Sequence, residues 1–281
     1  RGIHPPIWSF MGRFHCLRLF AWFLPTLISA SLEERVYIGQ IEKYFFIRYS
    51  DLEPHLRVRV KAKPEQLAYV FTDLIGQLEY LRQRGLLSRV VIDTYQRETE
   101  RYGGTHLIQR AEDYFFYDSR TVMEILHKQH TERTTINLDY IGISLIVLTL
   151  SAFGLSIDMI AQFLNISNDH NLYRKEFQKD RKMFIYAADY QDNWKEIRKA
   201  IDYPEIYDAL AALSVKSQDY AQAVFQADKD NAPTNSIQNI ASSIIHMFCN
   251  RLKGDNGWER KVYALARHAT HDLTALLAHR E

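Results

Sequence analysis

The segment YFFIRYSDLEPHLRVRV, residues 44–60, decides the fold because it predicts a β-hairpin. Residues 44–49 and 55–62 carry the aromatic and β-branched side chains typical of strands, and the sequence SDLEP between them has the composition of a turn. Downstream, Pro64 is expected to open a helix that continues to Gly85, because proline suits the first turn of a helix and glycine suits its end. This part of the chain is therefore expected to form two strands and a helix.

The second strand of the hairpin carries a cationic or imidazole side chain at every second position. Successive side chains of a strand point to opposite faces, so Leu56 and Val58 lie on one face and Arg57 and Arg59 on the other. The apolar face can cover a core. The cationic face then meets either water or a negatively charged group.

The elements that follow complete a β-β-α-β-α pattern. Residues 88–98, SRVVIDTYQRE, predict a third strand, and the Gly103-Gly104 pair separates it from a helix through residues 112–123. From residue 138 onward the pattern is almost wholly helical, with turns expected near residues 165–171, 189–192 and 228–233. The predicted fold class is α+β, with the N-terminal β-β-α-β-α portion packed against a mostly helical C-terminal half.

We expect one domain over residues 1–281, with a mixed portion at 44–130, a helical portion at 131–281 and a less readily matched segment at 1–43. The uncharged run YIGISLIVLTLSAFGLS, residues 140–156, is shorter than the ~20 apolar residues of a membrane span. It is better explained as a buried core helix.

The composition limits the classes of function. Thirty-five Lys and Arg against thirty-four Asp and Glu give a net charge of +1, which argues against a broad surface for nucleic acid or for an anionic membrane. The two cysteines, Cys16 and Cys249, lie in apolar contexts without a disulfide framework, which indicates reduced thiols in a cytoplasmic protein.

No cofactor or metal is expected. The chain has no glycine-rich phosphate-binding motif, so no bound nucleotide is expected. The pairs His127/His130 and His268/His271 have i, i+3 spacing, but neither has an evident third ligand. Solvated helix faces explain these histidines better than zinc does.

A second informative stretch, YQRETERYGG, covers residues 95–104. Arg97, Glu98 and Arg101 crowd the end of the predicted third strand just before the Gly-Gly turn. Polar residues on a loop held by a rigid scaffold often form functional sites. Solvated surface charges are the alternative explanation.

The third stretch, NSIQNIASSIIHMFCNRLKGD, covers residues 235–255 and predicts an amphipathic helix. Its apolar stripe contains Ile240 and Ile244, and its polar stripe contains Ser243, His246 and Asn250. The helix therefore presents His246 and Asn250 on one face. A lone helical histidine with a structural hydrogen bond is the alternative.

Together, the stretches FFIRYSDLEPHLRVRV, YQRETERYGG with AEDYFFYDS, and SIIHMFCNRLKGDNGWERKVYALAR resemble the C-terminal domain of class I lanthipeptide dehydratases. The same domain occurs as a separate chain in thiopeptide pathways. The resemblance runs over residues 44–267. It implies a lyase that removes glutamate from glutamylated Ser or Thr of a precursor peptide, leaving dehydroalanine or dehydrobutyrine.

The resemblance also implies the site. The family's elimination residues fall on Arg57, Arg59, Glu98, Arg101 and His246 of this chain. We expect His246 to transfer the proton, the arginines to bind glutamate and the developing charge, and Glu98 to hold the substrate ammonium or orient Arg101. Further substrate-binding candidates are Arg97, Tyr102, Asn250 and Arg251.

The implied partners are a glutamylated precursor peptide and a separate glutamylating domain or subunit. Direct binding of nucleic acid is not expected, because in the family the glutamyl-tRNA is used by that other domain. A homodimer is left open. Two other functions are also open: a pyridine-forming [4+2] cycloaddition enzyme of thiopeptide pathways, and a non-catalytic peptide-binding scaffold subunit. The paired arginines favour elimination, because cycloaddition has no glutamate to bind.

Overall fold

The computed structural model describes residues 10–15, 24–50, 53–131, 137–165, 170–189, 204–230 and 233–279. The chain forms two compact units whose sequence segments alternate. Unit 1 contains Arg1–Glu98, Phe115–Thr131 and Arg251–Gly254, and unit 2 contains Thr99–Tyr114, Glu132–Asn250 and Asp255–Glu281. The single domain expected from the sequence stays a prediction.

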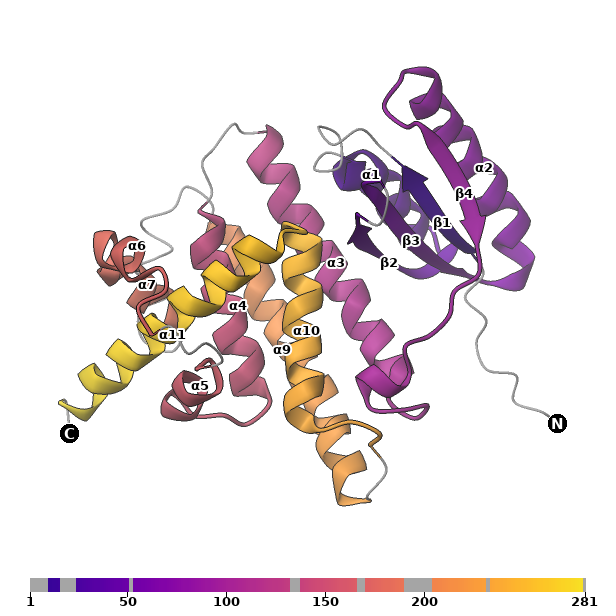
Figure 1. Ribbon diagram of the computed structural model, residues 1–281. Helices are drawn as coiled ribbons and strands as arrows, with labels where there is room; N and C mark the ends of the chain where they lie inside the picture. The colour runs from indigo at the N-terminus through magenta and orange to yellow at the C-terminus, as the bar shows by residue number, and fades with distance from the viewer. Residues whose placement is uncertain are drawn as a thin grey trace. The chain divides into compact units, whose positions relative to one another are not determined.

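Unit 1 is built on an antiparallel sheet whose described strands have the order β2-β3-β1-β4 (Figure 1). The elements are β1 (Phe10–His15), α1 (Leu24–Tyr37), β2 (Ile41–Tyr49), β3 (His55–Ala62), α2 (Pro64–Gln83), β4 (Arg89–Asp93) and residues 115–131 of α3 (Ile108–Thr131). The predicted hairpin is confirmed, with Phe46 opposite Val58 and Tyr49 opposite His55. The predicted helix from Pro64 is confirmed as α2.

The predicted β-β-α-β-α order is confirmed as β2, β3, α2, β4 and α3, but with two additions. The strand β1 and the helix α1 precede it and were not predicted. The sequence FMGRFH of β1 is a weak strand sequence, and pairing with β3 on one side and β4 on the other stabilises it. The strand β4 is shorter than predicted because its pairing with β1 ends at Asp93.

Aromatic side chains of β2 form the core of unit 1 with α3. The rings of Tyr44 and Phe116 meet edge to face with centroids 5.6 Å apart. The backbone N–H of Phe46 donates to the hydroxyl of Ser119 at 3.3 Å. Aromatic pairs of this geometry add to the gain from burying their area, so β2 is the central contributor to this core.

Unit 2 is helical. Its described helices are η1 (Glu100–Tyr102), residues 108–114 of α3, α4 (Leu138–Ala152), α5 (Ile157–Phe163), α6 (Arg174–Lys179), α7 (Arg181–Ala188), α9 (Pro204–Lys229), α10 (Ile237–Leu252) and α11 (Asn256–Ala278). The last two residues of α10 belong to unit 1. The turns predicted at residues 165–171, 189–192 and 228–233 lie partly outside the described residues.

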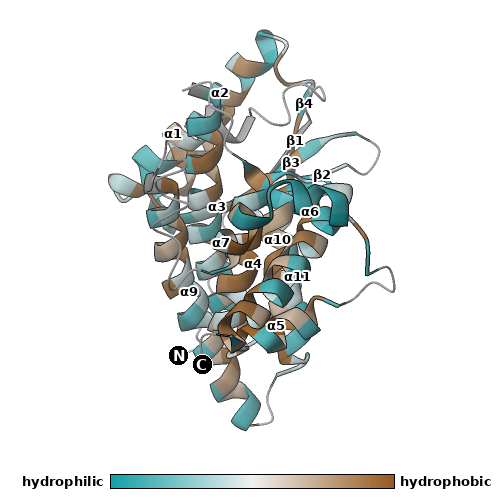
Figure 2. Ribbon diagram, turned by 90° about the vertical axis from the view of Figure 1, so that its left-hand side faces the viewer, coloured by the Kyte–Doolittle hydropathy of each residue, from teal (hydrophilic) through white to brown (hydrophobic). Residues whose placement is uncertain are grey.

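Helix α4 is the core of unit 2 and confirms a buried helix in the run 140–156, but the helix ends at Ala152. Every residue from Tyr140 to Leu150 is buried, and Figure 2 shows α4 hydrophobic along most of its length. At Gly142 an added Cβ would lie 2.7 Å from Val262 Cγ1, so glycine allows α11 to approach α4 closely. Among the described residues no single helix is long and apolar enough to cross a membrane; α4 and α5 reach that threshold only as a pair bent by 110°.

Candidate active site

Unit 2 contains a cavity of about 940 Å³. Its polar lining comes from η1, α10 and α11, and Leu164 and Leu172 are among its apolar lining residues. The charged and titratable lining residues are Arg101, His246, Glu259, Arg260, Tyr263 and Arg267. The cavity therefore combines an imidazole, one carboxylate and several guanidinium groups.

Arg101 enters this cavity from a tightly held turn. Gly103 and Gly104 follow η1 with φ of 91° and 103°, conformations that glycine adopts at little cost. The hydroxyl of Tyr220 donates to the carbonyl of Tyr102 at 2.9 Å, and the side chain of Asn235 donates to the carbonyl of Arg101 at 3.3 Å. These bonds fasten the turn to α9 and to the start of α10.

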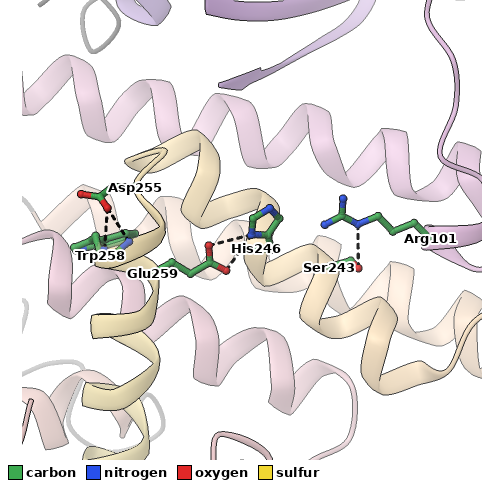
Figure 3. Close-up of polar contacts among 7 residues, drawn as sticks. Arg101, Ser243, His246, Asp255, Trp258 and Glu259 are labelled. Atoms are coloured by element: carbon green, nitrogen blue, oxygen red, sulfur yellow. Dashed lines mark hydrogen bonds and ion pairs between the residues drawn. The ribbon is translucent and has the colours of Figure 1, made fainter. Parts of the chain in front are cut away.

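The guanidinium of Arg101 is oriented by α10. Its Nε donates to the hydroxyl of Ser243 at 3.2 Å (Figure 3). Ser243 and His246 are three residues apart on α10, so they lie on one face of the helix. The turn and the helix together therefore place the Arg101 guanidinium and the His246 imidazole on one cavity.

Replacing Gly103 with alanine should lower the free energy of unfolding by about 2–4 kcal/mol, because positive φ strains alanine and the new methyl overpacks the turn. The added Cβ would lie 2.5 Å from Leu107 Cδ1 and 3.2 Å from Ile240 Cδ1. Gly85→Ala is the matched control, since Gly85 has φ of +72° but no atom within 4 Å of an added Cβ. Urea unfolding measures the free energy of unfolding of both variants. Equal losses would show that the side chains around Gly103 shift to accommodate the added methyl, and would contradict the predicted overpacking.

His246 is bonded to a carboxylate across the α10–α11 interface. Its Nδ1 lies 3.0 Å from both carboxylate oxygens of Glu259. The side chain of His246 is 38% exposed and that of Glu259 is 19% exposed, so the bond is at the wall of the cavity and partly shielded from water. Figure 3 shows His246 between Glu259 and Arg101.

The start of α11 fixes the position of Glu259. Asp255 caps this helix, accepting from the N–H groups of Gly257 at 2.8 Å and Trp258 at 3.2 Å (Figure 3). The indole N–H of Trp258 donates to Asp139 at 2.8 Å, which fastens α11 to the first turn of α4. Glu259 follows directly, in the first turn of α11, where the helix dipole favours a carboxylate.

Arg260, Tyr263 and Arg267 of α11 also line the cavity. Arg267 is buried, and its Nη2 donates to the carbonyl of His170 at 3.0 Å. Burial raises the pKa of the Tyr263 phenol, so this group is a neutral proton donor. With Arg101, Arg260 and Arg267 against Glu259, the lining has a net positive charge and suits a ligand that carries a carboxylate.

Arg57 and Arg59 lie on β3 in unit 1 among aromatic rings. The guanidinium carbon of Arg57 is 3.6 Å from the ring centre of Tyr49, and that of Arg59 is 4.6 Å from the ring centre of Tyr95. Only 5% of Arg59 is exposed, and burial lowers its pKa. The cationic face of the hairpin is therefore not simply solvated; its arginines rest on the negative faces of aromatic rings.

The Nε and Nη1 atoms of Arg59 have no hydrogen-bond acceptor among the described residues. Buried donors without acceptors cost free energy, and such groups are uncommon in folded proteins. A carboxylate acceptor would satisfy them.

Residues 23–270 match the family described as "Lantibiotic biosynthesis dehydratase C-term". The chain belongs to this family. The resemblance identified from its three sequence stretches is thereby confirmed, and it extends further toward the N-terminus than residue 44.

Relatives of the dehydratase C-terminal family cover most of the chain. It is 35% identical over 230 residues to the subtilin biosynthesis protein SpaB of Bacillus subtilis, a match to 82% of this chain and 22% of SpaB. It is 27% identical over 229 residues to the nisin biosynthesis protein NisB of Lactococcus lactis subsp. lactis, a match to 78% of this chain and 21% of NisB. The chain thus spans about a fifth of the length of these relatives.

Solved structures share the fold. The tRNA-dependent lantibiotic dehydratase MibB from Microbispora sp. 107891 superposes with a TM-score of 0.82 at 22% identity, covering 100% of this chain and 29% of MibB. The pyridine synthase TbtD from thiomuracin biosynthesis superposes with a TM-score of 0.67 at 16% identity, covering 95% of this chain and 99% of TbtD. Both solved structures therefore share the fold of this chain.

The candidate residues inferred from the dehydratase resemblance fall into two groups. The structure brings Arg101 and His246 to one cavity in unit 2 and sets Arg57 and Arg59 side by side on β3 in unit 1. A single site made from both groups stays a prediction. Glu98 is exposed in the segment after β4.

The further substrate-binding candidates have different surroundings. Arg97 is partly exposed after β4, Asn250 is partly exposed on α10, and Tyr102 is buried beneath the η1 turn. Arg251 is fully buried, forms an ion pair with Asp118 and donates from Nε to the carbonyl of Phe46 at 2.8 Å. These contacts make Arg251 part of the interior of unit 1.

The histidine pairs His127/His130 and His268/His271 lie on α3 and α11, and both His127 and His130 are exposed. His268 donates from Nε2 to the carbonyl of Leu172 at 2.9 Å, and the side chain of His271 is 80% exposed. In the part of the chain that the structure describes, no three His, Cys, Asp or Glu residues are grouped to hold a metal ion. Cys249 is a buried free thiol, and Cys16 lies outside the described residues.

Sequence reasoning missed the contribution of α11. Glu259, Tyr263 and Arg267 recur every four residues, which places them on one helix face. This polar stripe was a usable signal, because WERKVYALAR belongs to the stretch that identified the family. What the sequence did not reveal is that Glu259 meets His246, thirteen residues away across the turn between two helices.

Proposed function

We propose that this chain is the glutamate-eliminating lyase part of a dehydratase system, acting on glutamylated Ser or Thr of a ribosomal precursor peptide. The observation that carries the proposal is the cavity where His246, oriented by Glu259, shares a wall with Arg101. Its family relatives SpaB and NisB are biosynthesis proteins of subtilin and nisin, which supports a modified peptide as the substrate.

The proposed reaction is a β-elimination. His246 Nε2 removes the α-proton of the glutamylated residue, the electron pair forms the Cα–Cβ double bond, and the bond from Cβ to the ester oxygen breaks. Glutamate leaves as a carboxylate. An imidazole is suited to this proton transfer near neutral pH.

Negative charge develops twice, on the enolate of the peptide and on the departing carboxylate. Arg101 is the proposed ligand for this charge because guanidinium binds carboxylate through two parallel, charge-assisted hydrogen bonds. Arg260 and Arg267 add to the positive lining of the same cavity. Fixed cations aimed at developing charge are often the largest contribution to catalysis.

Arg57, Arg59 and Glu98 are proposed as further glutamate ligands on the strength of the family resemblance. The unsatisfied buried nitrogens of Arg59 support this, because a carboxylate is the acceptor they lack. Glu98 is exposed and is proposed to meet the glutamyl ammonium. We propose that glutamylation, with its tRNA, belongs to another domain or subunit.

The test is to incubate the chain with a glutamylated precursor peptide and to follow loss of glutamic acid by mass spectrometry. Wild-type protein should convert the ester to dehydroalanine or dehydrobutyrine without added nucleotide or metal. Arg101→Lys should slow this step by about 10²–10³-fold, because a point cation loses the fork of donors. Arg181→Lys is the matched control, since Arg181 pairs with Asp272 at 2.6 Å and does not line the cavity.

A glutamylated peptide that stays unchanged with wild-type protein would contradict the proposal. The fold shared with the pyridine synthase TbtD keeps a second candidate, [4+2] cycloaddition. A second peptide that carries two dehydroalanines tests this candidate in the same mass-spectrometric assay. Ring formation on the second peptide, together with no loss of glutamate from the glutamylated peptide, would favour cycloaddition.

A further inference from the structure

We propose that Glu259 is the positioning residue of His246, holding the imidazole in the one tautomer that can act as a base. This inference rests on the proposed elimination for its consequence in catalysis, but the tautomer itself can be observed without any reaction. Glu259 and His246 both belong to unit 2, so the inference does not depend on unit 1.

The hydrogen bond decides the tautomer. An ionised carboxylate only accepts hydrogen bonds, so with both Glu259 oxygens 3.0 Å from Nδ1 the ring hydrogen lies on Nδ1. In a neutral imidazole the other nitrogen, Nε2, then carries a lone pair. Nε2 has no hydrogen-bond partner among the residues that the structure describes, and His246 lines the cavity.

The scaffold makes this orientation reproducible. Asp255 caps α11, Trp258 bonds to Asp139, and Lys261 forms an ion pair with the same carboxylate at 2.7 Å. All three contacts lie within one turn of Glu259. A positioning group on a helix held in this way keeps its geometry better than a group on a loop.

The carboxylate also serves the charged state. When Nε2 takes the α-proton, the imidazole becomes an imidazolium, and the adjacent Glu259 carboxylate offsets this positive charge without itself accepting a proton. The proton then leaves from Nε2 to water or to the released glutamate, which restores the starting tautomer. A carboxylate that orients a histidine in this manner is a recurring arrangement in hydrolytic sites.

Glu259→Leu should lower the rate constant of elimination by about 10–100-fold and change KM by less than about threefold, because the imidazole loses its orientation while the binding cations remain. The hydrocarbon side chain removes the acceptor while keeping much of the volume. Glu65→Leu is the matched control, since Glu65 is also in the first turn of a helix and is exposed. Glu259→Gln, which keeps an acceptor for Nδ1–H, should recover part of the rate.

The tautomer is read by ¹⁵N NMR of histidine-labelled protein, with the His246 signal assigned by its absence in His246→Gln. Wild-type protein should show hydrogen on Nδ1, and Glu259→Leu should show it mainly on Nε2, the usual form of free histidine. A wild-type signal with hydrogen on Nε2 would overturn the inference. If wild-type protein shows the expected tautomer but eliminates no glutamate, the positioning stands and the proposed function fails.

A double variant separates positioning from direct contact with substrate. If Glu259 acts only through His246, then adding Glu259→Leu to His246→Gln should cause no further loss of rate. Multiplying losses would show that Glu259 acts independently of the imidazole and would contradict the proposal. Single-turnover reactions followed for hours make the low residual rates measurable.

Discussion

His246→Ala should leave the protein folded and reduce glutamate elimination by about 10²–10⁴-fold, the range expected when a positioned general base is lost. His246 is part of a polar stripe on α10 rather than of its apolar stripe, so alanine removes the proposed base without opening the core. The measurement is single-turnover conversion of a glutamylated peptide, followed by mass spectrometry. The glutamylated peptide should accumulate in place of the dehydrated product.

His271→Ala is the control for this experiment. The side chain of His271 is 80% exposed on α11, and His271 does not line the cavity. It should eliminate glutamate at the wild-type rate. Equal rates for the two alanine variants would show that His246 is not the base.

Asp118→Ala should destabilise the protein by about 3–5 kcal/mol, the cost typical of leaving one partner of a buried ion pair alone. Asp118 and Arg251 are both fully buried, and they are 133 positions apart in the sequence. The unpaired guanidinium would have no route to water in the folded state. Chemical denaturation gives the change in the free energy of unfolding.

Two further variants test this explanation. Asp219→Ala removes one partner of an exposed pair with Lys216, 3.2 Å apart, and should cost less than about 1 kcal/mol. Burial raises the pKa of Asp118 to about 6 in spite of Arg251, so desolvation outweighs the attraction within the pair. The double variant Asp118→Leu/Arg251→Met should therefore recover more than half of the loss, and failure to do so would contradict this account.

The same double variant decides between two roles of Arg251. A folded double variant that eliminates glutamate at the normal rate would remove Arg251 from the substrate-binding candidates. A folded double variant without activity would restore it. The buried contacts to Asp118 and to Phe46 favour the first outcome.

Local patterns predicted the hairpin, α2 and the buried helix α4, because each depends on neighbours in the sequence, whereas β1 and α1 were not predicted. The alternation in HLRVRV placed Leu56 and Val58 correctly in the core, and Pro64 marked the start of α2. The same alternation could not predict that Arg59 would also be buried. That outcome depends on Tyr95 of a later segment, whose ring covers the guanidinium.

The site was predictable only in part for the same reason. His246 and Arg101 were singled out by their motifs, and the structure adds that Ser243 connects the Arg101 turn to α10. The sequence did not predict the role of Glu259, because that role depends on how α10 and α11 face each other, which helical periodicity does not determine. The close approach of α11 to α4 at Gly142 is likewise visible only in three dimensions.

The interior position of β1 bears on where this domain can be cut out of a longer polypeptide. Family similarity begins at residue 23, whereas β1 (Phe10–His15) pairs with both β3 and β4. A fragment that begins at residue 23 would lack β1, the strand between β3 and β4. Both β3 and β4 would then have an unpaired edge. Exposed edges of this kind invite pairing between molecules, so a fragment trimmed by similarity alone should aggregate where one that retains Phe10 stays dispersed.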